Sequence, residues 1–91
     1  MKKSTRLFIT GTVQGIFFKQ FIKEQADKLG VRGFLRKLQD GRVEIFIEGD
    51  MEKVDAMISI CNRGPTHSNI RSVEQKEERY QDFKDFKVFN F

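Results

Sequence analysis

The sequence has few of the residues that build most nucleophilic and metal sites. Its 91 residues include one cysteine, Cys61, one histidine, His67, one proline and no tryptophan. A single cysteine excludes an internal disulfide, a Cys-x-x-Cys redox pair and a cluster of thiolate ligands. No apolar run is long enough to span a membrane, and the basic N-terminus is not followed by the apolar stretch of a signal peptide. We therefore expect a cytoplasmic protein.

A thiol–imidazole pair is the one nucleophilic arrangement that Cys61 and His67 could form. Cys61, however, falls on the apolar face of a predicted helix, and burial usually makes a thiol inert. The sequence therefore does not favour cysteine catalysis.

The length suits one domain, residues 1–91, with a modest core. Hydrophobic residues make up 38% and charged residues 33%, which is typical of a globular chain. Ten phenylalanines indicate an aromatic core. The net charge of +4 favours encounters with anionic ligands, but it does not by itself indicate a nucleic-acid partner.

The spacing of apolar residues predicts the element order βαββαβ. We expect strands over 5–11, 31–38, 42–48 and 70–80, a helix over 18–29 closed by Gly30, and a last strand over 86–91 after a break near Gln81-Asp82. Asp40-Gly41 predicts a hairpin, and Asp50 is the expected N-cap of a second helix that ends at Arg63-Gly64-Pro65. This pattern indicates an α+β, ferredoxin-like (split βαβ) fold, with an antiparallel sheet and two helices on one face.

Two further expectations concern the surface of this fold. Over residues 42–48 apolar and polar side chains alternate, so we expect a strand with one buried and one solvated face. The segment 70–80 is very polar and is expected to form an exposed edge or a hairpin. We interpret four basic residues as solvated charge: Arg6, Lys23, Lys53 and Lys87.

The stretch Gly11 to Lys19 organises the rest of the chain. It follows the predicted first strand and opens the first helix, so its two glycines lie where a strand turns into a helix. Such a turn can direct several backbone N–H groups and the positive end of the helix at one point. An anion is the natural ligand there, and Lys19 adds a full positive charge; alternatively, the glycines only make the turn.

The same residues resemble the acylphosphatase family. Gly11-x-Val13-Gln14-Gly15-Ile16-x-Phe18 resembles the family's first signature. The match continues through Gly33-Phe34-Leu35 and Asp40-Gly41-Arg42-Val43-Glu44 to Gly64-Pro65, and so covers nearly the whole chain.

The resemblance implies a small cytosolic enzyme that hydrolyses the carboxyl–phosphate bond of acyl phosphates without a metal or a cofactor. It implies that backbone N–H groups of the first loop hold the phosphate. In this chain the loop comprises Gln14, Gly15, Ile16, Phe17, Phe18 and Lys19. We expect a monomer whose ligand is a small anion (phosphate, sulfate or acyl phosphate), with no membrane partner and no expected nucleic acid.

Two side chains depart from the family pattern. Lys19 stands where the family has an arginine that clamps the phosphoryl oxygens. Lys37 stands where it has an asparagine that orients the attacking water. Lysine keeps the charge of arginine but lacks its planar two-pronged donor. A protonated lysine cannot accept a hydrogen bond from water, as an amide can; only a neutral Lys37 could do so. We therefore expect phosphate binding with hydrolysis weak or absent, a candidate pseudoenzyme.

Two alternatives remain. The chain could be a working acylphosphatase with variant side chains. It could also be an RNA-binding module, because RRM domains share the βαββαβ order and residues 7–11 loosely resemble their first-strand motif. The third strand argues against RNA, since residues 42–48 contain one aromatic ring and two glutamates where an RRM needs several rings and basic residues.

Overall fold

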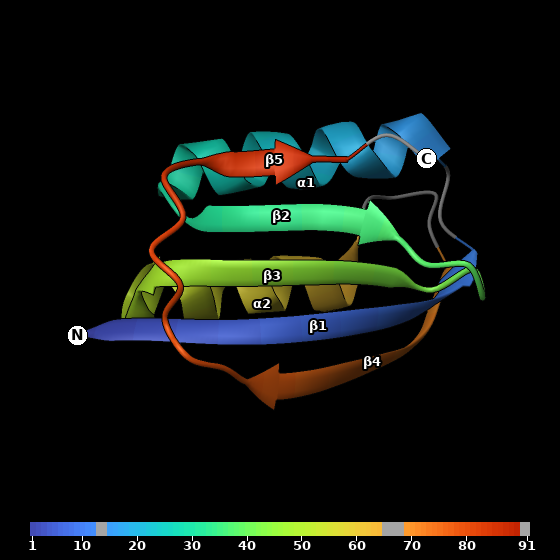
Figure 1. Ribbon diagram of the computed structural model, residues 1–91. Helices are drawn as coiled ribbons and strands as arrows, with labels where there is room; N and C mark the ends of the chain where they lie inside the picture. Colours follow the sequence, from blue (N-terminus) through green and yellow to red (C-terminus); the bar gives the residue numbers. More distant parts are fainter. Residues whose placement is uncertain (13–14, 65–68, 90–91) are drawn as a thin grey trace.

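The computed structural model describes residues 1–12, 15–64 and 69–89. Its elements follow the order βαββαββ, which is the expected βαββαβ with the last strand divided in two (Figure 1). They are β1 (Lys2–Thr12), α1 (Gly15–Leu29), β2 (Arg32–Lys37), β3 (Val43–Asp50), α2 (Met51–Arg63), β4 (Asn69–Glu77) and β5 (Phe86–Val88). Gln81 and Asp82, where a break was expected, lie between β4 and β5.

The five strands form one sheet in the order β4-β1-β3-β2-β5. β1 pairs antiparallel with β3 and β4, and β2 pairs antiparallel with β3. β5 runs parallel to β2, so the sheet is mixed rather than wholly antiparallel. β4 is an edge strand, as its polar sequence predicted.

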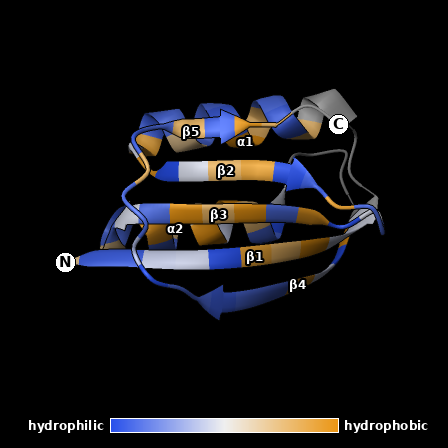
Figure 2. Ribbon diagram, in the orientation of Figure 1, coloured by the Kyte–Doolittle hydropathy of each residue, from blue (hydrophilic) through white to orange (hydrophobic). Residues whose placement is uncertain are grey.

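Both helices cover the same face of this sheet, as expected (Figure 1). The core lies between them and the strands. In Figure 2, β1 and β3 carry most of the hydrophobic colour and β4 is hydrophilic. The helices contribute buried side chains at the predicted spacing: Phe18, Ile22, Ala26, Val54, Met57 and Cys61. The strands contribute Leu7, Ile9, Leu35, Val43, Ile45 and Ile47. None of the described helices is both long and apolar enough to cross a membrane.

Several element boundaries differ from the sequence prediction. α1 begins at Gly15 rather than at residue 18, and β5 ends at Val88. β3 continues through Gly49 because Gly49 stays in register with Lys3 of β1. Asp50 does occupy the N-cap position of α2, but its side chain makes no capping hydrogen bond.

The prediction of a half-solvated β3 was wrong, because both faces of this strand are buried. The chain between β4 and β5, residues 78–85, crosses the face of the sheet that the helices leave open (Figure 1). We call it the crossing segment. Its Phe83 ring packs 5.7 Å from the ring of Phe34 and 5.5 Å from that of Phe46. Phe46 is thereby fully buried.

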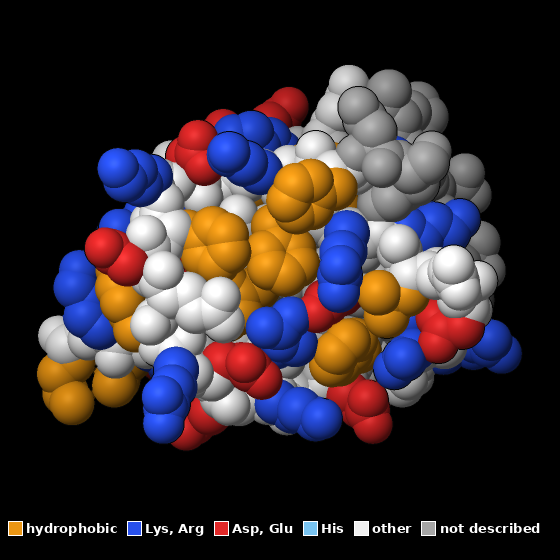
Figure 3. All heavy atoms as spheres, in the orientation of Figure 1, with side chains coloured by type: hydrophobic (Ala, Val, Ile, Leu, Met, Phe, Trp, Pro, Cys, Tyr) orange, Lys and Arg blue, Asp and Glu red, His pale blue; other side chains and the backbone are white. Residues whose placement is uncertain are grey.

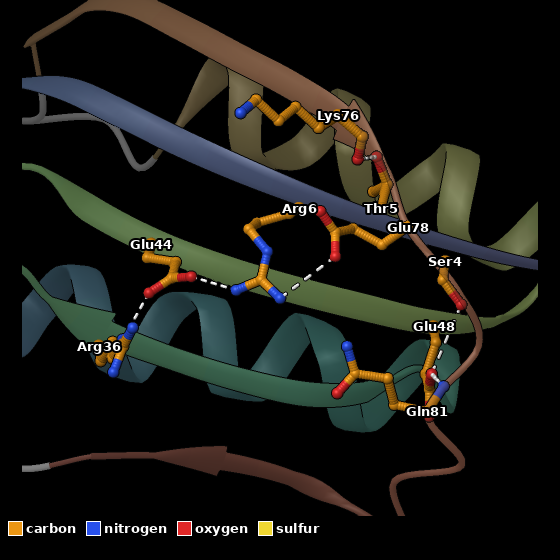
Figure 4. Close-up of polar contacts among 9 residues, drawn as sticks. All are labelled: Ser4, Thr5, Arg6, Arg36, Glu44, Glu48, Lys76, Glu78 and Gln81. Atoms are coloured by element: carbon orange, nitrogen blue, oxygen red, sulfur yellow. Dashed lines mark hydrogen bonds and ion pairs between the residues drawn. The ribbon is translucent and has the colours of Figure 1, made fainter.

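Glu48 attaches the crossing segment to the sheet. Its buried carboxylate accepts hydrogen bonds from the backbone N–H of Gln81, at 2.6 Å, and from that of Phe83. The Ser4 hydroxyl donates a third, at 3.4 Å (Figure 4). These donors satisfy a carboxylate that would otherwise be costly to bury.

Gly33 shows how closely β2 and β3 approach one another. It has φ +140°, and a Cβ atom at this position would overlap the backbone carbonyl of Phe46. A side chain cannot be accommodated there without moving the strand, so the glycine in the Gly33-Phe34-Leu35 motif has a structural reason.

Candidate functional site

The site predicted from the sequence lies at one end of the sheet, where β1 passes into α1. β1 ends at Thr12 and α1 begins at Gly15, so strand and helix are joined by two residues. Figure 1 shows that β2 ends and α1 begins at this same end. Of the predicted phosphate-binding residues, Gln14 lies outside the described residues.

The remaining loop residues form the first turn of α1, because the helix begins earlier than predicted. The first four N–H groups of a helix have no carbonyl partner within it. For a helix that begins at Gly15, they include the N–H groups of residues 15–17, which are half of the predicted loop. The first turn contains no acidic residue that would compete with an anion for these groups. The positive end of the helix dipole adds to the attraction.

Phe18 and Lys19 have different environments. Phe18 is 1% exposed and anchors the start of α1 in the core. Lys19 follows it and is partly exposed. Burial of Phe18 therefore fixes the position of the helix end from which Lys19 extends.

Lys37 is the last residue of β2 and is exposed. It is in register with Val43 of β3, which in turn is in register with Ile9 of β1. Val43 and Ile9 are buried on the side of the helices, and neighbours in register point to the same face of a sheet. Lys37 thus lies on the helix side of the sheet, at the end where α1 begins.

Asp40 and Arg42 lie in the hairpin that joins β2 to β3, at the same end. Asp40 accepts hydrogen bonds from the Arg42 backbone N–H, at 3.0 Å, and from Arg42 Nε, at 2.8 Å. Both bonds lower the pKa of Asp40, and the bond from the Arg42 backbone N–H has the larger effect. The carboxylate is held by the turn, which agrees with its interpretation as a turn residue.

Cys61 is fully buried in α2, as predicted. Burial raises the pKa of its thiol to about 12, so the thiolate does not form near neutral pH. His67 lies outside the described residues. Within residues 1–12, 15–64 and 69–89, no group of His, Cys, Asp and Glu side chains could hold a metal ion.

A polar network on the open face of the sheet was missed from the sequence. Glu44 binds the guanidinium groups of both Arg6 and Arg36, and Arg6 also reaches Glu78 at 3.4 Å (Figure 4). The prediction of Arg6 as solvated charge was therefore wrong. Partial burial lowers the pKa of Arg6, but hydrogen bonds to Glu44 and Glu78 outweigh it and leave the pKa raised.

The same face is a poor stacking platform for RNA. Hydrophobic side chains gather near its middle, among Lys, Arg, Asp and Glu (Figure 3). Phe46 is covered, however, and Arg6 lies over both its ring, at 5.2 Å, and that of Phe34, at 5.8 Å. These rings already contact an arginine, and buried glutamates precede and follow Phe46 in β3. Such a surface does not favour the stacking of RNA bases.

Comparison with known proteins agrees with the motifs and the fold. A family model of acylphosphatase matches residues 5–88. The chain belongs to the acylphosphatase family. The acylphosphatase of Thermococcus kodakarensis is 44% identical over 82 residues, which cover 90% of each chain. That of Rubrobacter xylanophilus is 43% identical over 76 residues, covering 84% of this chain and 69% of the relative.

A solved acylphosphatase shows the same fold. The crystal structure from Bacillus subtilis aligns with a TM-score of 0.89 at 27% identity, covering 99% of this chain and 100% of the other. The likeness extends over the whole ferredoxin-like architecture, including the mixed sheet. Membership of the acylphosphatase family thus accounts for the fold that places a strand–turn–helix at the candidate site.

Proposed function

We propose that this chain is a single-domain, cytoplasmic, monomeric acylphosphatase-like protein that binds phosphate, sulfate or acyl phosphate through residues 14–19. Hydrolysis of the carboxyl–phosphate bond is weak or absent, because Lys19 and Lys37 replace the arginine and asparagine of the family. The observation that carries this proposal is the position of Lys37, on the helix side of the sheet and at the end where α1 begins.

Binding rests on backbone groups rather than on the two altered side chains. The N–H groups of the first turn of α1 and the helix dipole attract an anion whatever side chains surround them. Lys19 can still act on a phosphate as a point charge. The exchange of side chains therefore leaves the binding half of the activity in place.

Catalysis suffers at both positions. A transferring phosphoryl group spreads its charge over three oxygens, which a planar guanidinium fits better than an ammonium. Removal of one such donor typically costs ~10²–10³ in rate. Loss of the group that orients the water costs roughly another 10². If the two losses are additive, which need not hold for residues that act as a unit, about 10⁴ in rate is lost.

The binding half is tested by calorimetric titration of the full chain with orthophosphate and with sulfate. We expect saturable binding that weakens in Lys19→Ala, together with a rise in the melting temperature as phosphate is added. A melting temperature that does not respond to either anion would contradict this half.

The relatives support one alternative, since proteins 35–44% identical to this chain are named acylphosphatases. A working enzyme with variant side chains would hydrolyse benzoyl phosphate well above the spontaneous rate. The assignment to this chain would require that Lys37→Ala abolish the activity, which excludes a contaminating hydrolase.

A further inference from the structure

A group of phenylalanine rings on the open face of the sheet is only partly covered. The ring of Phe34, in β2, lies 5.7 Å from that of Phe83 in the crossing segment and 5.7 Å from that of Phe89, which follows β5. Phe46, beside them, is fully buried, but Phe89 remains 46% exposed. Figure 3 shows this face, with hydrophobic side chains gathered near its middle. We call Phe34, Phe83 and Phe89 the aromatic patch.

The backbone holds Phe89 in a fixed position. Its N–H donates to the carbonyl of Leu35 at 2.9 Å, which continues the parallel pairing of β5 with β2 beyond Val88. Leu35 itself is buried in the core. An exposed side chain that is already held in place loses little conformational freedom when a partner covers it. Large side chains of this kind supply much of the binding energy of protein interfaces.

Two cationic side chains share this face with the aromatic patch. Lys87 of β5 is in register with Phe34, and neighbours in register point to the same face of a sheet. Arg36 lies two residues after Phe34 in β2, and its guanidinium is 5.8 Å from the centre of the Phe34 ring. Both cations are exposed, and 53% of the Arg36 side chain is accessible to solvent.

The carboxylates of the chain leave these two cations with binding capacity. Glu44 binds Nε of Arg36, but it also binds Arg6, and its side chain is only 4% exposed. Asp85 lies at the other end of β5. Among the described residues, no ion pair includes Lys87, and Arg36 pairs with Glu44 alone. The ammonium of Lys87 and the terminal nitrogens of Arg36 can therefore bind carboxylates of another molecule.

We propose that the aromatic patch docks an acidic segment of a partner protein, in which apolar side chains are flanked by aspartate or glutamate. An apolar side chain of that segment covers the Phe89 ring, and its carboxylates pair with Lys87 and Arg36. Aromatic residues and arginine are enriched in the cores of protein interfaces. A second copy of this chain matches the patch less well, because two chains that each carry a net charge of +4 repel one another.

This surface is distinct from the proposed phosphate site. Lys37 lies on the helix side of the sheet, whereas the aromatic patch lies on the open face. The proposal therefore does not depend on phosphate binding. The patch is small, so we expect a weak and transient contact.

The test uses a blocked hexapeptide, Glu-Glu-Trp-Leu-Glu-Glu, titrated with the full chain. The chain contains no tryptophan, so tryptophan emission comes from the peptide alone. We expect a saturable blue shift of this emission, with a dissociation constant of about 0.1–1 mM at low salt and weaker binding at high salt. The same peptide with lysine in place of glutamate should give no shift. The peptide with two serines in place of Trp-Leu should not compete with the acidic probe.

Two variants and a matched control assign the effect to the patch. Phe89→Ala removes the exposed ring and should weaken peptide binding at least about tenfold. Lys87→Gln should weaken it about twofold to fivefold at low salt, and less at high salt. Lys53→Gln removes the same charge from an exposed position of α2, on the other face of the sheet, and should leave the affinity unchanged. Thermal unfolding without peptide verifies that each variant is folded.

Several results would overturn the proposal. They are the absence of a shift with the acidic peptide, an unchanged affinity in Phe89→Ala, and equal binding of the basic peptide. An equal loss in Lys53→Gln and Lys87→Gln would show a response to net charge alone. Sedimentation that shows self-association of the wild type but not of Phe89→Ala would assign the patch to a second copy. Tighter binding of a single-stranded oligonucleotide, lost in Phe89→Ala, would assign it to a nucleic acid; either result would refute an acidic protein segment.

Discussion

Replacement of Glu48 by glutamine is expected to loosen the crossing segment from the sheet. The carboxylate of Glu48 is fully buried and accepts the backbone N–H groups of Gln81 and Phe83 on separate oxygens. In Glu48→Gln, one oxygen becomes an amide nitrogen that can only donate. One backbone N–H then loses its acceptor and faces another donor.

The magnitude follows from these bonds. A hydrogen bond to a charged group contributes ~1.5–3 kcal/mol, and a buried donor without a partner costs a similar amount. The neutral amide is cheaper to bury than the carboxylate, which offsets part of this loss. We expect a net loss of about 2 kcal/mol in the free energy of unfolding, or roughly 10 °C in the melting temperature of a domain this small.

Urea unfolding of Glu48→Gln beside Glu77→Gln is the assay. Glu77 is an exposed glutamate of β4, so its replacement should change the free energy of unfolding by less than about 0.5 kcal/mol. Hydrogen exchange should also accelerate at the amides of Gln81 and Phe83 in Glu48→Gln. Equal midpoints for the two variants, with unchanged exchange at these amides, would refute the role of Glu48.

The remaining predictions concern the packing and ion pairing at other positions. Arg6→Ala removes a partly buried partner of a buried glutamate and should cost about 3 kcal/mol, whereas Arg36→Ala, at a side chain 53% exposed, should cost under about 1 kcal/mol in the same urea assay. Gly33→Ala should prevent folding or cost over about 3 kcal/mol by thermal unfolding, because its Cβ would overlap a β3 carbonyl; Gly41→Ala has open space around its Cβ and should cost about 1 kcal/mol through its φ of +92° alone. The raised pKa of Cys61, about 12, predicts that a thiol reagent labels the native protein slowly at pH 8–9 and rapidly in urea. The unfolded thiol loses its proton at lower pH than the folded one, so this residue lowers stability as pH rises above about 9. Rapid labelling of the native chain, equal costs for the two arginines, or a harmless Gly33→Ala would each contradict the packing described.

Much of the fold could be predicted because its signals are local. The hairpin at Asp40-Gly41, the glycine at position 30 and the helical spacing from Phe18 onward each depend on a few neighbouring residues. Together they determine the order of the elements. The parallel pairing of β5 with β2 could not be read in this way, since it depends on the path of residues 78–85 over the sheet.

The buried outer face of β3 escaped prediction for the same reason. With only their sequence neighbours considered, Glu44 and Glu48 predict a face of the strand that is exposed to solvent. The residues that bind them, however, are distant in the sequence. Glu48 binds residues 33 and 35 positions away, and Glu44 binds an arginine 38 positions away. One signal was present: Phe46 is a large apolar residue between the two glutamates, which is unusual on a solvated face.

For the site, the sequence located both lysines through the family pattern but could not give their surroundings. The register of β2 with β3 shows on which side and at which end of the sheet Lys37 lies. Because α1 begins at Gly15, most of the predicted loop belongs to the first turn of the helix. The chemical consequence of two lysines remains a prediction from their donor properties.

The central claim is that two side chains separate this chain from an efficient hydrolase, and steady-state hydrolysis of benzoyl phosphate tests it most directly. The wild type is measured beside Lys19→Arg, Lys37→Asn and the double variant. We predict that kcat/KM of the double variant exceeds that of the wild type by at least about 10², approaching ~10⁴. A wild type within about tenfold of the double variant, with both well above the spontaneous rate, would show that lysine can do the work of the asparagine and would contradict the account.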